Sequence, residues 1–182
     1  MLTRRSFLAS AFFAATASSA SAHYFLPDPR FAPQIVPDPT GQPIGTVVVR
    51  TREFFLFLVL GDGSALRYGV GVGRQGFSWT GIAEIGRKAE WPTWTPPTSM
   101  IEREPKLAKW RRGMPGGPSN PLGARALYLY KDGRDTLYRI HGTNAPSSIG
   151  RAVSSGCVRM VNNDIKDLYS RVRIGARVVV EG

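Results

Sequence analysis

The stretch HGTNAPSSIGRAVSSGCVRM, residues 141–160, decides how the rest of the sequence is interpreted. It opens with His141, directly after an apolar run that ends at Ile140, and it contains Cys157, the only cysteine of the chain. A cysteine attacks as its thiolate, and a nearby imidazole can take the thiol proton and later protonate a leaving amine. The spacing alone leaves two interpretations open: a catalytic pair, or two packing residues that the fold keeps apart.

The residues beside this cysteine and histidine suit the catalytic interpretation. Gly156 would let the backbone turn tightly and would let N–H groups at positions 156 and 157 face a developing oxyanion. The imidazole would also need its second ring nitrogen held by a carboxylate or a carbonyl. The other histidine, His23, lies close to the predicted start of the mature chain, where the backbone is usually mobile, so it is a poor candidate for the base.

Strand patterns on both sides of this stretch predict a mostly β (α+β) domain with one clear helix. Apolar residues at helical spacing between positions 165 and 172 predict that helix, with Asn162 or Asn163 as its N-cap and Gly175 after its end. The expected strands are residues 46–49, 53–60, 64–72, 81–90, 124–130, 136–140 and 177–181.

Residues 91–121 are rich in Pro, Gly and Trp, and we expect them to form a long loop without regular structure. Loops of this length in a single domain are often lids or binding loops. Trp91, Trp94 and Trp110 could stack on a ligand, or they could close a small core, which we expect for at least one of them.

Length and composition restrict the class of protein. The chain has 182 residues, 42% of them hydrophobic, which suits one domain with its own core. A single cysteine excludes an internal disulfide framework, a Cys-based zinc finger and a Cys-ligated iron–sulfur cluster, and two histidines leave little for a His-rich metal site. The formal net charge is +11, but the arginines are scattered, so we expect no nucleic-acid partner.

The first 22 residues have the pattern of a cleaved signal peptide. Arg4 and Arg5 precede an apolar run over residues 7–17, and Ala20-Ser21-Ala22 offers the small residues of a cleavage site. The arginine pair also matches the twin-arginine export motif, although a Sec signal remains the alternative. We therefore expect a periplasmic protein, with no transmembrane segment in the mature chain. Residues 23–44 carry six prolines and predict a linker or a wrapped arm.

Taken together, these motifs resemble the L,D-transpeptidase catalytic domain family (YkuD-like), whose pattern is His-Gly followed by Ser/Thr-His-Gly-Cys. The chain has His141-Gly142 and then Ser154-Ser155-Gly156-Cys157-Val158-Arg159. Three further segments match the family: residues 117–124, 163–168 and 175–180. The resemblance covers about residues 45–181, and we take 45–182 as the catalytic domain.

The resemblance implies a role for each motif residue. Cys157 would be the nucleophile, His141 the general base and acid, and Gly142 the donor of the carbonyl that orients the imidazole. Backbone N–H groups of Ser155, Gly156 and Cys157 would form the oxyanion hole. Arg159 would bind the acidic peptide stem. The chain departs from the family where it has Ser155 in place of a second histidine, which puts that position's support of the oxyanion or of the loop in doubt.

The activity implied by the resemblance is acyl transfer on peptidoglycan, in cell-wall biogenesis. The thiolate would attack the bond between diaminopimelate and the terminal D-Ala of a tetrapeptide stem, and D-Ala would leave a thioester behind. An amine of a second stem would then take the acyl group and form a 3→3 cross-link. An envelope protein, a free D-amino acid or water could replace that amine. The resemblance implies no metal or organic cofactor and a thiol that carbapenems acylate.

Other interpretations have less support. Gly71-Val72-Gly73-Arg74-Gln75-Gly76 formally matches a dinucleotide-binding fingerprint, but no amphipathic helix follows it. An L,D-carboxypeptidase that uses water at the same site is one alternative to transfer. A cell-wall-binding protein that kept the fold without turnover is another, and it would leave the thiol inert.

Overall fold

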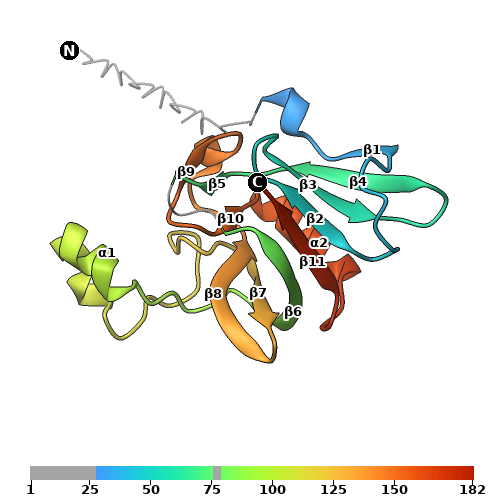
Figure 1. Cartoon of the computed structure of the whole chain (residues 1–182). Helices are drawn as coiled ribbons and strands as arrows, with labels where there is room; N and C mark the ends of the chain where they lie inside the picture. The colour runs from blue at the N-terminus through green and yellow to red at the C-terminus, as the bar shows by residue number, and fades with distance from the viewer. Residues whose placement is uncertain (1–27, 76–78) are drawn as a thin grey trace, which may run out of the picture.

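The computed structural model describes residues 28–75 and 79–182 (Figure 1). The predicted signal peptide and residues 23–27 lie outside the described residues. Within the described ranges, eleven strands and two α-helices give the mostly β class that the sequence predicts. The strands are β1 (Gln34–Pro37), β2 (Val47–Arg50), β3 (Phe55–Val59), β4 (Ser64–Gly69), β5 (Val72–Gly73), β6 (Gly81–Glu90), β7 (Arg125–Lys131), β8 (Arg134–His141), β9 (Ala152–Ser154), β10 (Val158–Arg159) and β11 (Arg177–Glu181). The helices are α1 (Thr98–Arg103), α2 (Asn162–Arg171) and the 3-10 helices η1 (Pro29–Phe31), η2 (Pro105–Trp110) and η3 (Pro146–Ser148).

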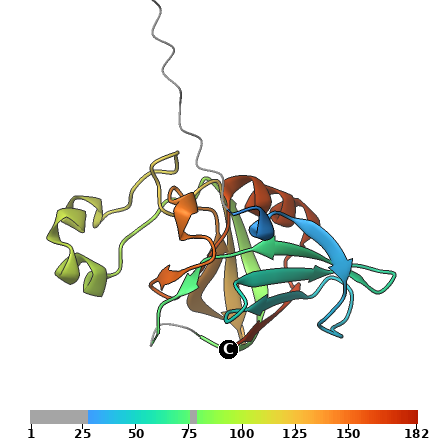
Figure 2. The ribbon, with the colours of Figure 1, turned by 90° about the horizontal axis from the view of Figure 1, so that it is seen from above.

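Nine of the strands form one curved sheet in the order β1-β4-β3-β2-β11-β6-β7-β8-β10 (Figures 1 and 2). The C-terminal strand β11 lies in the middle, parallel to β2 and antiparallel to β6, so it joins the two halves of the sheet. At one edge, β10 pairs in parallel with β8. The two remaining strands, β5 and β9, form a separate parallel pair beside that edge.

Apolar residues alternate between two packed faces. In β2, Val47 and Val49 join the main core, while Val48 faces a smaller cluster with Phe57 and Ala65. Helix α2 covers the main core with Ile165 and Leu168, both fully buried. Each such side chain contributes roughly 1.5–3 kcal/mol relative to an exposed one, so α2 is held by its apolar face.

Two segments carry more structure than the sequence predicts. Residues 28–44 pack on the domain, because Phe31 is buried beside Phe55 and β1 extends the sheet next to β4. Residues 91–121 contain α1 and η2, so the expectation of an unstructured loop was wrong. Both views show this segment standing out from the sheet (Figures 1 and 2). Its tryptophans Trp91, Trp94 and Trp110 are not buried, so none of them closes a core.

The predicted N-cap was also wrong. Val161 occupies the N-cap position of α2, and no side chain caps the helix there. Asn162 is the first helical residue, and its side chain is used elsewhere, in the site described below.

Candidate active site

The imidazole of His141 lies at the end of β8 and is 5% exposed. Its Nδ1 is within 2.5 Å of the main-chain carbonyl oxygen of Gly142. A carbonyl can only accept a hydrogen bond, so Nδ1 carries the hydrogen and Nε2 keeps its lone pair. The carbonyl contact expected for Gly142 is therefore present, and it leaves Nε2 as the nitrogen suited to act as a base.

The strand pairing brings Cys157 to the same face of the sheet as His141. In the parallel pairing of β10 with β8, Arg159 lies opposite His141 and Val158 lies opposite Ile140. Val158 and Ile140 face the core, so Cys157 and Arg159 point to the other side with His141. The sulfur lies 4.0 Å from the carbonyl oxygen of Leu137. Within residues 28–75 and 79–182, no hydrogen bond joins the thiol to the imidazole directly.

Burial keeps both groups neutral in the resting protein. It lowers the pKa of His141 to about 4; the Gly142 carbonyl opposes this shift, and the nearby Arg159 and Arg139 add to it. Burial also raises the pKa of the Cys157 thiol. The main-chain N–H of Arg139 and the positive charges of Arg139 and Arg159 oppose this shift, because they favour the thiolate. The pair is therefore a thiol and a neutral imidazole, which can exchange a proton when a carbonyl carbon is attacked.

A buried hydroxyl closes the loop that carries the cysteine. Ser154 Oγ donates to the carbonyl oxygen of Cys157 at 2.6 Å and accepts from the N–H of Gly156 at 3.1 Å. Gly156 has φ of 121°, which residues with a side chain rarely adopt. Its N–H, predicted as an oxyanion-hole donor, donates to Ser154 Oγ in this structure. Ser154 belongs to the motif, but the sequence pattern predicted no role for it.

A second polar residue without a predicted role at the site is Asn162. Its Oδ1 accepts from the N–H of Ala124 at 3.0 Å and from the N–H of Thr143 at 3.2 Å. A Cβ at Gly142 would collide with this oxygen, so the glycine after His141 is needed for the contact. Asn162 thus joins the start of α2 to the turn that follows His141.

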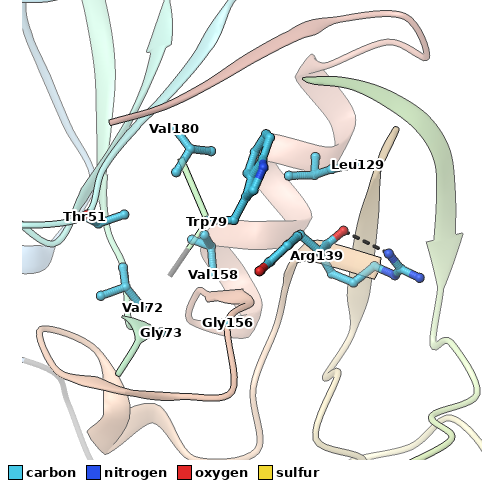
Figure 3. A pocket seen from close by; sticks show the side chains of 10 residues that line it. Thr51, Val72, Gly73, Trp79, Leu129, Arg139, Gly156, Val158 and Val180 are labelled. Atoms are coloured by element: carbon cyan, nitrogen blue, oxygen red, sulfur yellow. Dashed lines mark hydrogen bonds between the residues drawn. The ribbon is translucent and has the colours of Figure 1, made fainter. Parts of the chain in front are cut away.

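A small cavity lies behind the cysteine loop (Figure 3). It holds about 10 Å³, and Gly156 and Val158 line it on the side of the loop. Trp79 extends into this region between Val180 and Leu129, and its ring stacks on Tyr138 with centroids 5.6 Å apart. A volume of this size accommodates at most one water molecule, so this cavity is too small to hold a peptide.

The predicted residues are thus brought together at one sheet edge. Arg159 lies on β10, opposite His141 of β8, and is partly buried. The described part of the chain contains no group of three or more His, Cys, Asp or Glu side chains arranged to hold a metal ion. None of its helices combines the length and the apolar character needed to cross a membrane.

The glycine-rich stretch that begins at Gly71 has a structural explanation. The N–H of Gly71 donates to the carbonyl oxygen of Arg159, and the N–H of Arg159 donates back. A Cβ at Gly71 would collide with the main chain of Ser148. The next element after β5 is a strand, β6, and not the helix that a dinucleotide site requires.

Comparison with known proteins agrees with this geometry. Residues 44–180 match the family model YkuD, described as the L,D-transpeptidase catalytic domain. The chain is 40% identical over 139 residues to "Probable L,D-transpeptidase YbiS" of Escherichia coli, which covers 72% of the chain and 43% of that protein. It is 38% identical over 140 residues to "Probable L,D-transpeptidase ErfK/SrfK" of the same species, covering 74% of the chain and 43% of that protein. The chain thus spans about two fifths of the length of these curated relatives.

Two solved structures have the same fold. A protein from Brucella melitensis, named "Probable carnitine operon oxidoreductase caia", is 49% identical and superposes with a TM-score of 0.59, covering 85% of this chain and 96% of that one. L,D-transpeptidase 3 from Mycobacterium tuberculosis is 16% identical with a TM-score of 0.55, covering 75% of this chain and 60% of that one, and this likeness concerns the fold alone. With the family model matched over residues 44–180 and the two strands of its motif side by side, the chain belongs to the L,D-transpeptidase catalytic domain family.

Proposed function

We propose that this protein is a cysteine-dependent L,D-transpeptidase that acts on tetrapeptide stems of peptidoglycan. The observation that carries the proposal is the parallel pairing of β10 with β8, which puts Cys157 and His141 on one face beside Arg159. Family membership supplies the reaction class, and the neutral thiol and imidazole supply the chemistry.

In the proposed reaction, Cys157 Sγ attacks the carbonyl carbon of the bond between diaminopimelate and D-Ala while Nε2 of His141 takes the thiol proton. The N–H groups of Ser155 and Cys157 face the oxyanion. The imidazolium then protonates the nitrogen of D-Ala, which leaves, and a thioester remains on Cys157. An acceptor amine attacks the thioester, gives its proton to His141 and releases the thiol.

Arg159 is the proposed contact for the stem. Its guanidinium lies on the same face as the cysteine, opposite His141, and a guanidinium binds carboxylates through paired hydrogen bonds. D-Ala presents its carboxylate next to the bond that breaks, and diaminopimelate carries a free carboxylate at the far end of its side chain. We place the stem along the exposed side of β10.

The test uses purified mature protein with a disaccharide-tetrapeptide and mass spectrometry of the products. Loss of D-Ala with a 3→3 dimer is expected, together with a thioester intermediate on the protein, and Cys157→Ala should abolish all three. Loss of D-Ala without a dimer would indicate an L,D-carboxypeptidase or another acceptor, such as an envelope protein. An unmodified thiol with no turnover, and no acylation by a carbapenem, would refute the proposal and leave a cell-wall-binding role.

The name of the Brucella relative suggests an oxidoreductase, but this chain gives that activity little support. The glycine-rich stretch near β5 is explained by its contacts with Arg159 and Ser148. Incubation with NADH or NADPH tests the point directly. Saturable quenching of tryptophan fluorescence by either nucleotide, in a protein that releases no D-Ala, would favour the oxidoreductase.

We also propose that the protein is exported to the periplasm with residues 1–22 removed. The supporting observation is the sequence pattern of the leader, with Arg4 and Arg5 before an apolar run. N-terminal sequencing of the periplasmic protein should begin at His23. Replacement of both arginines by lysine should block a twin-arginine route and leave a Sec route largely intact.

A further inference from the structure

Strand β8 is irregular next to the nucleophile. Its pairing with β7 shifts register between Tyr128 and Tyr130, so β8 carries a bulge. Leu137 in this bulge has φ of 64°, a left-handed conformation that is unfavourable for a residue with a branched side chain. The side chain of Leu137 is 76% exposed, so apolar burial does not hold the bulge in place. Polar contacts must stabilise it.

Two side chains supply these contacts. Thr136 Oγ1 donates to the carbonyl oxygen of Leu129 at 2.7 Å and accepts from the N–H of Tyr138 at 3.2 Å, and the carboxylate of Asp135 makes the others. Oδ1 of Asp135 accepts from the N–H of Leu137 at 2.8 Å and from Nη1 of Arg139 at 2.7 Å. Its other oxygen, Oδ2, accepts from Nη2 of Arg139 at 2.8 Å, which makes the ion pair bidentate. Residues four apart in a regular strand are separated by about 13 Å, so the bulge is what brings this pair together.

Arg139 is held on every side. Its guanidinium lies over the ring of Tyr128, 4.3 Å from the centroid. Nη1 donates to the carbonyl oxygen of Tyr138 at 2.9 Å, and a dashed line marks this bond in Figure 3. Its side chain is 15% exposed. An arginine so fixed cannot swing out to clamp a substrate without breaking the bidentate pair. Arg139 is therefore suited to hold the backbone of the site, whereas Arg159 is the residue proposed to contact the substrate.

The backbone that this pair holds faces the sulfur of Cys157. The carbonyl oxygen of Leu137 is 4.0 Å from Sγ, and as an acceptor it can bond only the neutral thiol. The main-chain N–H of Arg139 also acts on Cys157, and it favours the thiolate. The bulge thus provides one wall of the nucleophile's surroundings, made of main-chain atoms of residues 137–139.

We propose that Asp135 and Arg139 are positioning residues for the nucleophile, which hold the bulge in β8 so that its backbone seats and stabilises the thiolate of Cys157. The inference rests on the proposed function for its relevance to catalysis. Its chemistry can be measured without any peptidoglycan, because Cys157 is the only thiol of the chain.

The charged and titratable groups around the sulfur give the test a clear sign. They are Asp135, Arg139 and His141 on β8 and Arg159 on β10. The negative charge of Asp135 by itself raises the pKa of Cys157. Asp135→Ala should therefore lower the thiol pKa if the residue acts only through its charge. Displacing the Leu137 carbonyl would also lower that pKa, because this oxygen bonds only the protonated thiol. The same substitution should therefore raise the pKa only if Asp135 positions the main-chain N–H of Arg139, which favours the thiolate.

The experiment measures the rate of alkylation of the mature protein by iodoacetamide across pH, which gives the apparent thiol pKa. For Asp135→Ala we expect slower alkylation at pH 7, by about tenfold for each unit of pKa rise. Asp135→Asn keeps an oxygen for the N–H of Leu137 and should recover most of the rate. Faster alkylation of Asp135→Ala would overturn the proposal.

Arg139→Lys keeps the positive charge but loses the bidentate fork, so it provides a second variant in case Asp135→Ala does not fold. Slower alkylation is expected, and an unchanged rate would overturn the proposal. The matched control is Arg171→Lys, which alters the other ion pair four residues apart, Asp167–Arg171 on α2. The control should alkylate like the wild type. Failure of transpeptidation with these alkylation results intact would refute the proposed function alone.

Discussion

Asn162→Ala tests whether a side chain at the start of α2 holds the turn that carries His141. The substitution removes the acceptor of two main-chain N–H groups, those of Ala124 and Thr143. A buried donor left without a partner costs about 1–3 kcal/mol, so the two together should lower the free energy of unfolding by about 2–6 kcal/mol. Because 1 kcal/mol shifts the melting temperature of a protein of this size by about 2–4 °C, we expect a fall of roughly 4–24 °C.

The assay is urea denaturation together with thermal melting of the mature protein. Asn163→Ala is the matched control, because Asn163 is an exposed neighbour on the same helical turn. Asn162→Ser separates this role from helix capping. Serine caps a helix as well as asparagine, but its shorter side chain does not reach Ala124 and Thr143. A cost below 0.5 kcal/mol for Asn162→Ala on this scale, or a neutral Asn162→Ser, would refute the reasoning.

Three further outcomes are expected. Ser154→Ala should slow the acylation of Cys157 by a carbapenem about tenfold or more, because the loop loses two hydrogen bonds. Ser154→Thr keeps the hydroxyl and should restore much of this rate. Burial lowers the pKa of His141 to about 4, so the unfolded chain binds more protons than the folded protein between pH 6.5 and 4. The folded protein should therefore keep its full stability above pH 6.5 and lose about 3 kcal/mol as the pH falls to 4. Urea melts across this range measure the loss, and a His141→Gln variant with the same pH dependence would contradict the prediction. Gly71→Ala should lower stability by about 1–3 kcal/mol because its Cβ collides with the main chain of Ser148, whereas an unaffected melting temperature would show that the contact is loose.

The local pattern of the sequence was enough for several parts of the structure. Alternating and continuous apolar runs located β2, β3, β6, β7 and β11, because strand formation there depends on side chains of the same segment. The motif identified the family and singled out Cys157 and His141. The spacing of those two residues said nothing of their distance, since residues far apart in sequence become neighbours only through strand pairing.

The sequence by itself therefore determined the strand-rich class and the family, and it predicted which side chains are reactive. Only the tertiary structure decided which groups surround them. Asn162 has the sequence context of an N-cap, but its oxygen satisfies donors on two other segments, Ala124 and Thr143. Leu137 fits an ordinary strand pattern, but it adopts a left-handed conformation because Asp135 and Arg139 compensate for it. These outcomes depend on hydrogen bonds between distant or irregular backbone segments. Such bonds do not repeat at a regular spacing in the sequence, so a periodic pattern cannot predict them.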